Sequence, residues 1–267
     1  MIELGAALLA GAVIGLVLGT LGAGGSILAV PVLVHLFGAD AHAATTGSLL
    51  VVAVSAALAS LAARGKRPIR FGPGLAFGLI AALGSVGGSV LAQGIDGDLL
   101  LIGVSLLMVA VALSMLRREP AHPGTGVLDQ PIITFSPTFH CACPRAAKVL
   151  LTGAALGLLT GLFGVGGGFL VVPALVLALG LTIDEAIGTS LVVIAVTSTA
   201  ALATRAGLGI DVDWGPVLAL TAAAAVVATL AARRTAALPR RPLTLAFASA
   251  LLALAVATGV PALASPR

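Results

Sequence analysis

The sequence predicts an all-α integral membrane protein, a polytopic helical bundle of two inverted-topology repeats, each with a Gly-interrupted, half-length helix. Three observations carry this prediction: the apolar composition, two glycine-rich interruptions and the charges of the loops. Hydrophobic residues make up 59% of the 267 residues and charged residues only 9%. A soluble protein of this length needs more charge to cover its surface. The chain is therefore expected to lie in a lipid bilayer.

The predicted helices follow from the apolar runs, because about 20 residues are needed to cross a hydrocarbon core. Eight runs qualify within a few residues: 4–21, 43–63, 71–93, 99–116, 146–163, 185–204, 214–232 and 243–260. The first lacks the basic region and cleavage site of a signal peptide and is predicted to be a membrane helix. Two shorter runs, 26–38 and 168–180, each follow a glycine cluster and are predicted half-helices. Lipid offers no hydrogen bonds to a broken backbone, so the breaks should face inward.

The two halves of the chain repeat each other. The segment "GTLGAGGSILAVP" from Gly19 aligns with "GLFGVGGGFLVVP" from Gly161, and the alignment runs without a gap from Gly11 and Gly153 to about Gly65 and Gly207. Within the match, glycines recur every fourth residue before each cluster, a spacing typical of contact surfaces between membrane helices. We interpret these stripes as packing surfaces; they are Gly11, Gly15 and Gly19, and Gly153, Gly157 and Gly161.

Loop charges predict how the repeats are oriented, since short cytoplasmic loops are enriched in Lys and Arg. The loop "RGKRPIR" is basic, whereas its counterpart "GLGIDVD" is acidic. The next pair reverses the signs, because "QGIDGD" carries only Asp and "RRTAALPRR" carries four Arg. Equivalent loops should therefore lie on opposite sides of the membrane. The predicted organisation is a first repeat at 1–116, a cytoplasmic linker at 117–147 and a second repeat at 148–267.

The predicted linker contains "TFHCACPR", with His140, Cys141 and Cys143. These residues supply at most three ligands and lack the usual C-x-x-C spacing of a metal site. We interpret the segment as an ordinary reduced cytosolic loop, and the role of the three residues stays open.

The glycine clusters are the candidate functional site. Discontinuous helices in inverted repeats form the midplane binding sites of secondary transporters, and the N-terminal ends of half-helices attract anions. We therefore predict a twofold anion cradle at the breaks that contains no fixed cation. The alternative is close helix packing at the clusters themselves. The predicted substrate-binding residues are Gly24, Gly25, Ser26, Thr46, Ser48, Gly166, Gly167, Gly168, Thr189 and Ser190.

The hydroxyl groups in this set have two interpretations. They begin the helices that follow the short segments, where they could donate to oxygens of an anion. Equally, Ser and Thr in membrane helices often bond to their own backbone one turn back. Both interpretations stay open for Ser48 and Ser190, which occupy equivalent positions.

Few ionisable residues approach the predicted site. Asp40 aligns with Thr182, and both are predicted helix N-caps, with Thr182 and Glu185 in capping-box spacing. His42 aligns with Asp184. A histidine there could titrate near neutral pH and couple transport to protons; a simple interfacial helix start is the alternative.

These residues resemble a known family. The paired "GxGG(S/G)xxxxP" cores, followed by "TTGSLLVVAVS" and "GTSLVVIAVTS", resemble the TauE/SafE sulfite exporter family of membrane permeases. The resemblance implies transport of sulfite, organosulfonates or related small anions across a prokaryotic plasma membrane. Its paired motifs fall on Gly22, Gly24, Gly25, Ser26 and Pro31, and on Gly164, Gly166, Gly167, Gly168 and Pro173.

The predicted function is therefore a permease that moves a small anion by alternating access. An enzyme is not expected, since the serine-hydrolase, P-loop and zinc-protease motifs are absent and neither cluster completes G-x-G-x-x-G. We expect no cofactor, no metal and no nucleic-acid partner; the partners are the small anionic substrate and the lipid bilayer, and glycine-rich faces could support a homodimer. The alternatives are an anion channel and a non-transporting scaffold or sensor that acts through the linker.

Overall fold

The structure is a computed structural model that describes residues 2–22, 26–65, 68–117, 143–164, 168–206, 210–234, and 249, 252–253 and 255–257 near the C-terminus. Every regular element in these ranges is a helix. In chain order they are α1 (Ile2–Leu21), α2 (Ser26–Phe37), α3 (Ala41–Ala62), α4 (Phe71–Gln93), α5 (Gly97–Arg117), α6 (Cys143–Phe163), α7 (Gly168–Leu179), α8 (Ile183–Ala206) and α9 (Trp214–Arg234). The all-helical prediction is confirmed for this part of the chain.

The predicted helices agree with the observed ones to within three residues at each end. The half-helices α2 and α7 begin at Ser26 and Gly168, directly after the glycine clusters, as predicted. The helix α6 begins at Cys143, three residues before its apolar run, so it extends into the predicted linker. His140, Cys141 and most of the predicted run 243–260 lie outside the described residues.

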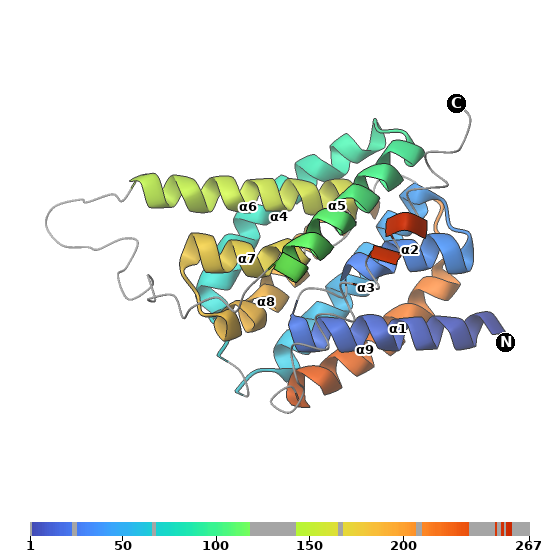
Figure 1. The fold of residues 1–267 in the computed structure, drawn as a ribbon, viewed down its shortest axis with the longest axis horizontal. Coiled ribbons are helices and arrows are strands. Elements are labelled where there is room, and N and C mark those ends of the chain that lie inside the picture. The colour runs from blue at the N-terminus through green and yellow to red at the C-terminus, as the bar shows by residue number, and fades with distance from the viewer. Residues whose placement is uncertain are drawn as a thin grey trace, which may run out of the picture.

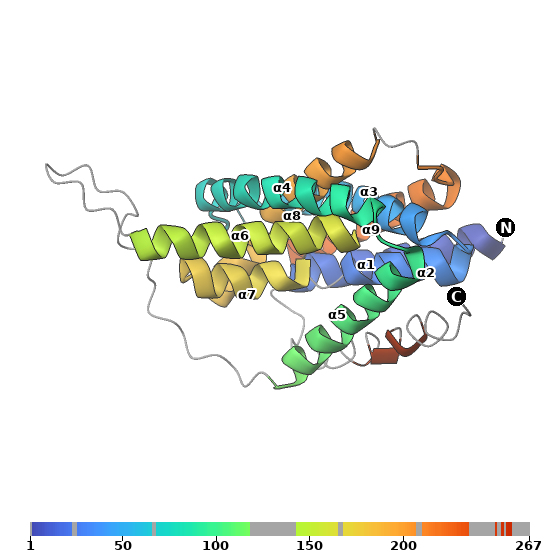
Figure 2. The same cartoon turned by 90° about the horizontal axis from the view of Figure 1, so that it is seen from above.

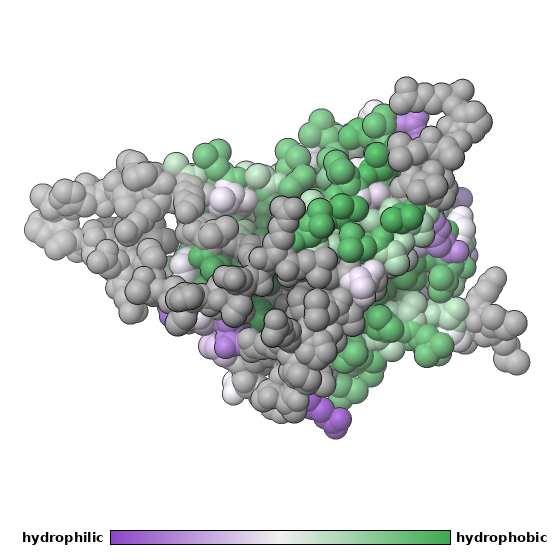
Figure 3. Space-filling model, in the orientation of Figure 1, coloured by the Kyte–Doolittle hydropathy of each residue, from purple (hydrophilic) through white to green (hydrophobic). Residues whose placement is uncertain are grey.

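Four described helices are long and apolar enough to cross a membrane by length and composition, namely α3, α4, α8 and α9. Large apolar side chains also cover the outside of the bundle: Leu83 is 78% exposed and Leu151 71%. In Figure 3, hydrophobic residues dominate the described surface of one face, and hydrophilic ones form small groups at its periphery. An exposed apolar surface of this extent is what a bilayer covers.

The two halves pack in the same way. The helix α1 packs against α9, and its counterpart α6 packs against α4, so the first helix of each half lies on the fourth helix of the other half. Likewise, α3 contacts α9 and α8 contacts α4. In Figures 1 and 2, α1 and α6 enter from opposite ends of the long axis and both end toward the middle of the molecule.

The glycine stripes make these contacts close, which confirms that they are packing surfaces. A Cβ built on Gly11 would lie 2.6 Å from the backbone oxygen of Leu220 in α9, and one on Gly19 2.5 Å from that of Ala228. On α6, Gly157 and Gly161 lie even closer to the backbone of α4. The helix axes can approach this far only because no side chain stands between them.

Candidate functional site

Two glycines in the left-handed conformation end the helices that precede the breaks. Gly22 has φ of 76° and Gly164 has φ of 63°, a region that glycine adopts without steric cost. Each donates its N–H to a carbonyl four residues back, Gly22 to Leu18 at 2.9 Å and Gly164 to Thr160 at 3.0 Å. The chain thus leaves α1 and α6 at equivalent positions, before α2 and α7 begin.

Each break packs on a helix of the other half. A Cβ on Gly22 would meet the backbone oxygen of Ile187 in α8 at 2.5 Å, and one on Gly164 would meet that of Thr45 in α3 at 2.5 Å. Ile187 and Thr45 are equivalent in the sequence alignment. The half-helices α2 and α7 also contact each other, and their Ile27 and Val171 are fully buried. The described residues on either side of the breaks therefore lie in the protein interior, as predicted.

Ser48 and Ser190 form hydrogen bonds to the glycines at the breaks. The hydroxyl of Ser190 donates to the carbonyl of Gly22 at 3.1 Å and to that of Ile187 at 2.8 Å. The hydroxyl of Ser48 donates to the carbonyl of Gly164 and to that of Thr45. Both side chains are fully buried. The backbone bond predicted for these hydroxyls is present, and a second bond reaches the opposite half; contact with substrate stays a prediction.

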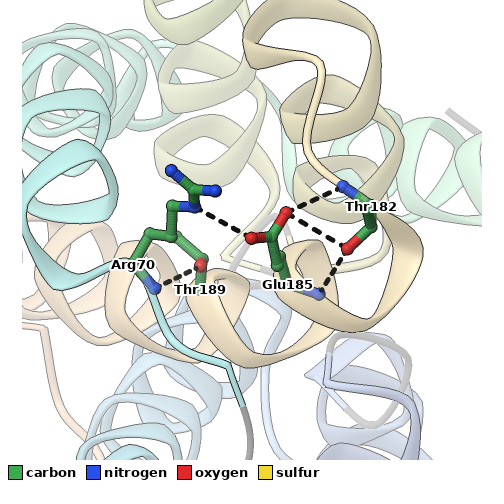
Figure 4. Close-up of polar contacts among 4 residues, drawn as sticks. All are labelled: Arg70, Thr182, Glu185 and Thr189. Carbon is green, nitrogen blue, oxygen red and sulfur yellow. Dashed lines mark hydrogen bonds and ion pairs between the residues drawn. The ribbon is translucent and has the colours of Figure 1, made fainter. Parts of the chain in front are cut away.

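The predicted threonines have different surroundings. Thr46 donates its hydroxyl to the carbonyl of His42 at 2.7 Å. Thr189 accepts the backbone N–H of Arg70 at 3.1 Å, a contact between α8 and the segment before α4 (Figure 4). Among the other predicted site residues, Ser26 and Gly168 are the first residues of α2 and α7, while Gly24, Gly25, Gly166 and Gly167 lie outside the described residues.

A cation that the sequence analysis did not expect lies next to the Gly164 break. Arg205, in the last turn of α8, is only 2% exposed. Its guanidinium donates from Nη1 to the hydroxyls of Thr45 at 2.6 Å and Thr46 at 3.3 Å. From Nη2 it donates to the carbonyls of Gly161 at 2.7 Å and Leu162 at 3.2 Å, just before the Gly164 break. A positive charge thus lies beside one of the two breaks.

A second arginine, Arg70, directly precedes α4 and contacts the start of α8. Arg70 forms an ion pair with Glu185 through Nε and Oε1 at 2.9 Å, with side chains 42% and 18% exposed. The other oxygen of Glu185 contacts the backbone N–H and the hydroxyl of Thr182, both at 3.1 Å (Figure 4). The amide of Glu185 in turn donates to the Thr182 hydroxyl at 3.4 Å. The predicted capping box at Thr182 is confirmed.

The predicted coupling residues lie in first helical turns. His42 donates its backbone N–H to the carboxylate of Asp40 at 3.1 Å, which confirms Asp40 as the N-cap of α3. Asp184 is exposed at the equivalent place in α8. Their participation in proton coupling stays a prediction.

Comparison with known proteins places the chain in a family. Residues 7–258 match the sequence profile described as "Sulfite exporter TauE/SafE". The chain belongs to this family. A "Probable membrane transporter protein" of Xylella fastidiosa (strain Temecula1 / ATCC 700964) is 38% identical over 69% of this chain and 67% of its own length. The "Probable membrane transporter protein" YdhB of Bacillus subtilis (strain 168) is 28% identical over 68% of the chain and 70% of its own, and no solved structure matches.

Membership in the sulfite exporter TauE/SafE family identifies the chain as a multi-pass membrane transporter. Arg205 and Arg70 are the candidate site residues that the sequence analysis missed. Arg205 follows an apolar run by one residue, where an arginine resembles an ordinary flanking charge. The signal that could have found it is the repeat itself, because Arg205 aligns with Ala63 and so breaks the symmetry.

Proposed function

We propose that this TauE/SafE transporter moves a small anion, sulfite or an organosulfonate, across the prokaryotic plasma membrane by alternating access between two inverted repeats. The exchange of contacts between the two halves carries this proposal. The carbonyl of each break glycine accepts a hydroxyl from the other half, Gly22 from Ser190 and Gly164 from Ser48. Two equivalent contacts of this kind can open one at a time.

Electrostatics support an anion as the substrate. The half-helices α2 and α7 begin at the breaks, and a helix N-terminus carries a partial positive charge that favours anions. Arg205 adds a full positive charge near the Gly164 break. Neutral dipoles together with one cation can hold an anion and still release it.

The experiment is uptake of radiolabelled sulfite and of sulfoacetate into proteoliposomes that contain the full chain, with and without a pH gradient. We compare the wild type with Gly167→Leu, which changes the second glycine cluster. The matched control is Gly87→Leu on α4, where a Cβ would have nothing within 4 Å. We expect saturable flux in the wild type and the control and its loss in Gly167→Leu.

The outcomes separate the alternatives. Flux that rises linearly with concentration, without saturation or exchange of internal for external anion, would identify a channel. If neither anion moves through a folded wild-type protein, the proposed substrate class is wrong. A response to the pH gradient would make His42 and Asp184 the residues to change next.

A further inference from the structure

Arg205 is among the most deeply buried large side chains that the structure describes. It belongs to α8, one of the four helices long and apolar enough to cross a membrane. Charged side chains within such segments are costly, and they mark substrate or ion pathways more often than they serve packing. A partner of opposite charge is therefore expected for Arg205.

Among the described residues, the groups that bond to Arg205 are neutral. They are two threonine hydroxyls and two backbone carbonyls. In the described part of the chain, no acidic side chain forms an ion pair with it, whereas Arg70 is paired with Glu185. Burying an arginine without a counter-ion is unfavourable, so an anion that reached this guanidinium would balance its charge.

The guanidinium also has an unused donor. Nε of Arg205 is buried and has no hydrogen-bond partner among the described residues. Capping the end of α6 accounts for the bonds from Nη2 to Gly161 and Leu162 and leaves Nε without a role. The contact with Leu162 is the longer of the two, at 3.2 Å against 2.7 Å. An oxygen that replaced it would let Nε and Nη2 act together as one edge of the guanidinium fork.

We propose that Arg205 binds the transported oxyanion through this Nε and Nη2 edge, while Thr45 and Thr46 hold Nη1 in place. The planar fork of an arginine matches two oxygens of one acid group, and sulfite and sulfonates both present such a pair. The assignment of a sulfur oxyanion rests on the proposed function; the assignment of Arg205 as its binding residue rests on the burial and contacts above. Arg205 aligns with Ala63, so in the described part of the chain this charged contact lies at the Gly164 break and has no arginine equivalent at the Gly22 break.

The test measures binding and transport separately on the full chain in lipid nanodiscs and proteoliposomes. Thermal unfolding is followed with sodium sulfite, with sulfoacetate and with sodium chloride at equal ionic strength. The variants are Arg205→Gln and Arg205→Lys, and the control is Arg234→Gln, which removes one positive charge from the exposed end of α9. Flux is measured on the same four proteins.

We expect sulfite or sulfoacetate, but not chloride, to raise the unfolding temperature of the wild type and of Arg234→Gln. In Arg205→Lys the apparent affinity should fall, and the KM should rise, by about ten- to a hundredfold, because a charged hydrogen bond is lost while the charge is kept. In Arg205→Gln the stabilisation should vanish. If Arg205→Gln does not fold, Arg205→Lys alone decides.

Two results would overturn the inference. One is a wild type that neither oxyanion stabilises. The other is a folded Arg205 variant that sulfite stabilises as it does the wild type. Flux that persists in either case leaves the proposed function standing. Binding that depends on Arg205, in a wild type that transports neither anion, would instead support the site and contradict the proposed transport.

Discussion

The break at Gly22 packs on α8, and the break at Gly164 packs on α3, through residues that are equivalent in the two halves. Ile187 and Ser190 hold the first break, and Thr45 and Ser48 hold the second. The two glycines have similar φ values and similar capping bonds. The backbone of the candidate site is thus built twice.

The charges around the two breaks are not built twice. Beside the Gly164 break, the guanidinium of Arg205 is buried among hydroxyls and carbonyls. At the start of α8, the helix that packs on the Gly22 break, Arg70 and Glu185 form a partly exposed ion pair. The difference teaches that the packing of the broken helices follows the repeat, whereas the charge does not. Small residues and hydroxyls hold the breaks in both halves. The proposed contact with an anion would use Arg205, beside one break.

The largest expected effect tests the shared backbone. In Gly164→Ala, the alanine would have to adopt the left-handed backbone conformation of Gly164. Its Cβ would lie 2.5 Å from the backbone oxygen of Thr45. Strain and overpacking together should lower the free energy of unfolding by about 2–5 kcal/mol. Gly22→Ala should behave alike. Denaturant unfolding of the purified protein in micelles measures both.

Gly38→Ala is the matched control for this prediction. Gly38 has the same φ of 63°, and a Cβ built on it would have nothing within 4 Å. It should cost only the conformational strain, about 1–2 kcal/mol. Equal losses in Gly38→Ala and Gly164→Ala would contradict the close packing of the break on α3.

The sequence predicted most of this shared backbone. Apolar run lengths placed the helices, Asp40 and Thr182 marked the starts of α3 and α8, and the glycine clusters marked the breaks. These features are readable because each depends on neighbouring residues in the chain. The glycine stripes were also readable, since a one-in-four spacing defines one helix face.

The charged part of the candidate site was not predicted, because only the alignment of Arg205 with Ala63 pointed to it in the sequence. Arg205 reaches Gly161, 44 positions earlier, and Thr45, 160 positions earlier. Nothing local distinguishes such an arginine from one that flanks a membrane span. The bond from Ser190 to Gly22 was hidden for the same reason, because it spans 168 positions and depends on how Gly22 packs on α8.

A smaller effect compares the two serines. Ser48→Ala and Ser190→Ala each remove a buried bond to the carbonyl of a break glycine. Each should destabilise the protein by about 1–3 kcal/mol, because the carbonyl loses a partner in the interior. Unfolding in micelles gives the values, and proteoliposome flux shows whether one break matters more.

Ser60→Ala is the control for the serine pair. Its hydroxyl donates to Ala57 in its own helix, so no contact between the two halves is lost. Its cost should be at most about 0.5 kcal/mol. If Ser48→Ala or Ser190→Ala proved as mild as Ser60→Ala, the bonds between the halves would not stabilise the breaks.

The smallest effect concerns the ion pair at the start of α8. Arg70 is 42% exposed, so water and salt screen its attraction to Glu185. A double-mutant cycle with Arg70→Gln and Glu185→Gln should give a coupling energy of about 0.2–1 kcal/mol that falls as salt is added. Thr182→Ala, measured beside it, separates the loss of the helix cap from the loss of the pair. A larger coupling energy that salt did not change would mean that this pair is shielded like Arg205, and the contrast between the two charged regions would then disappear.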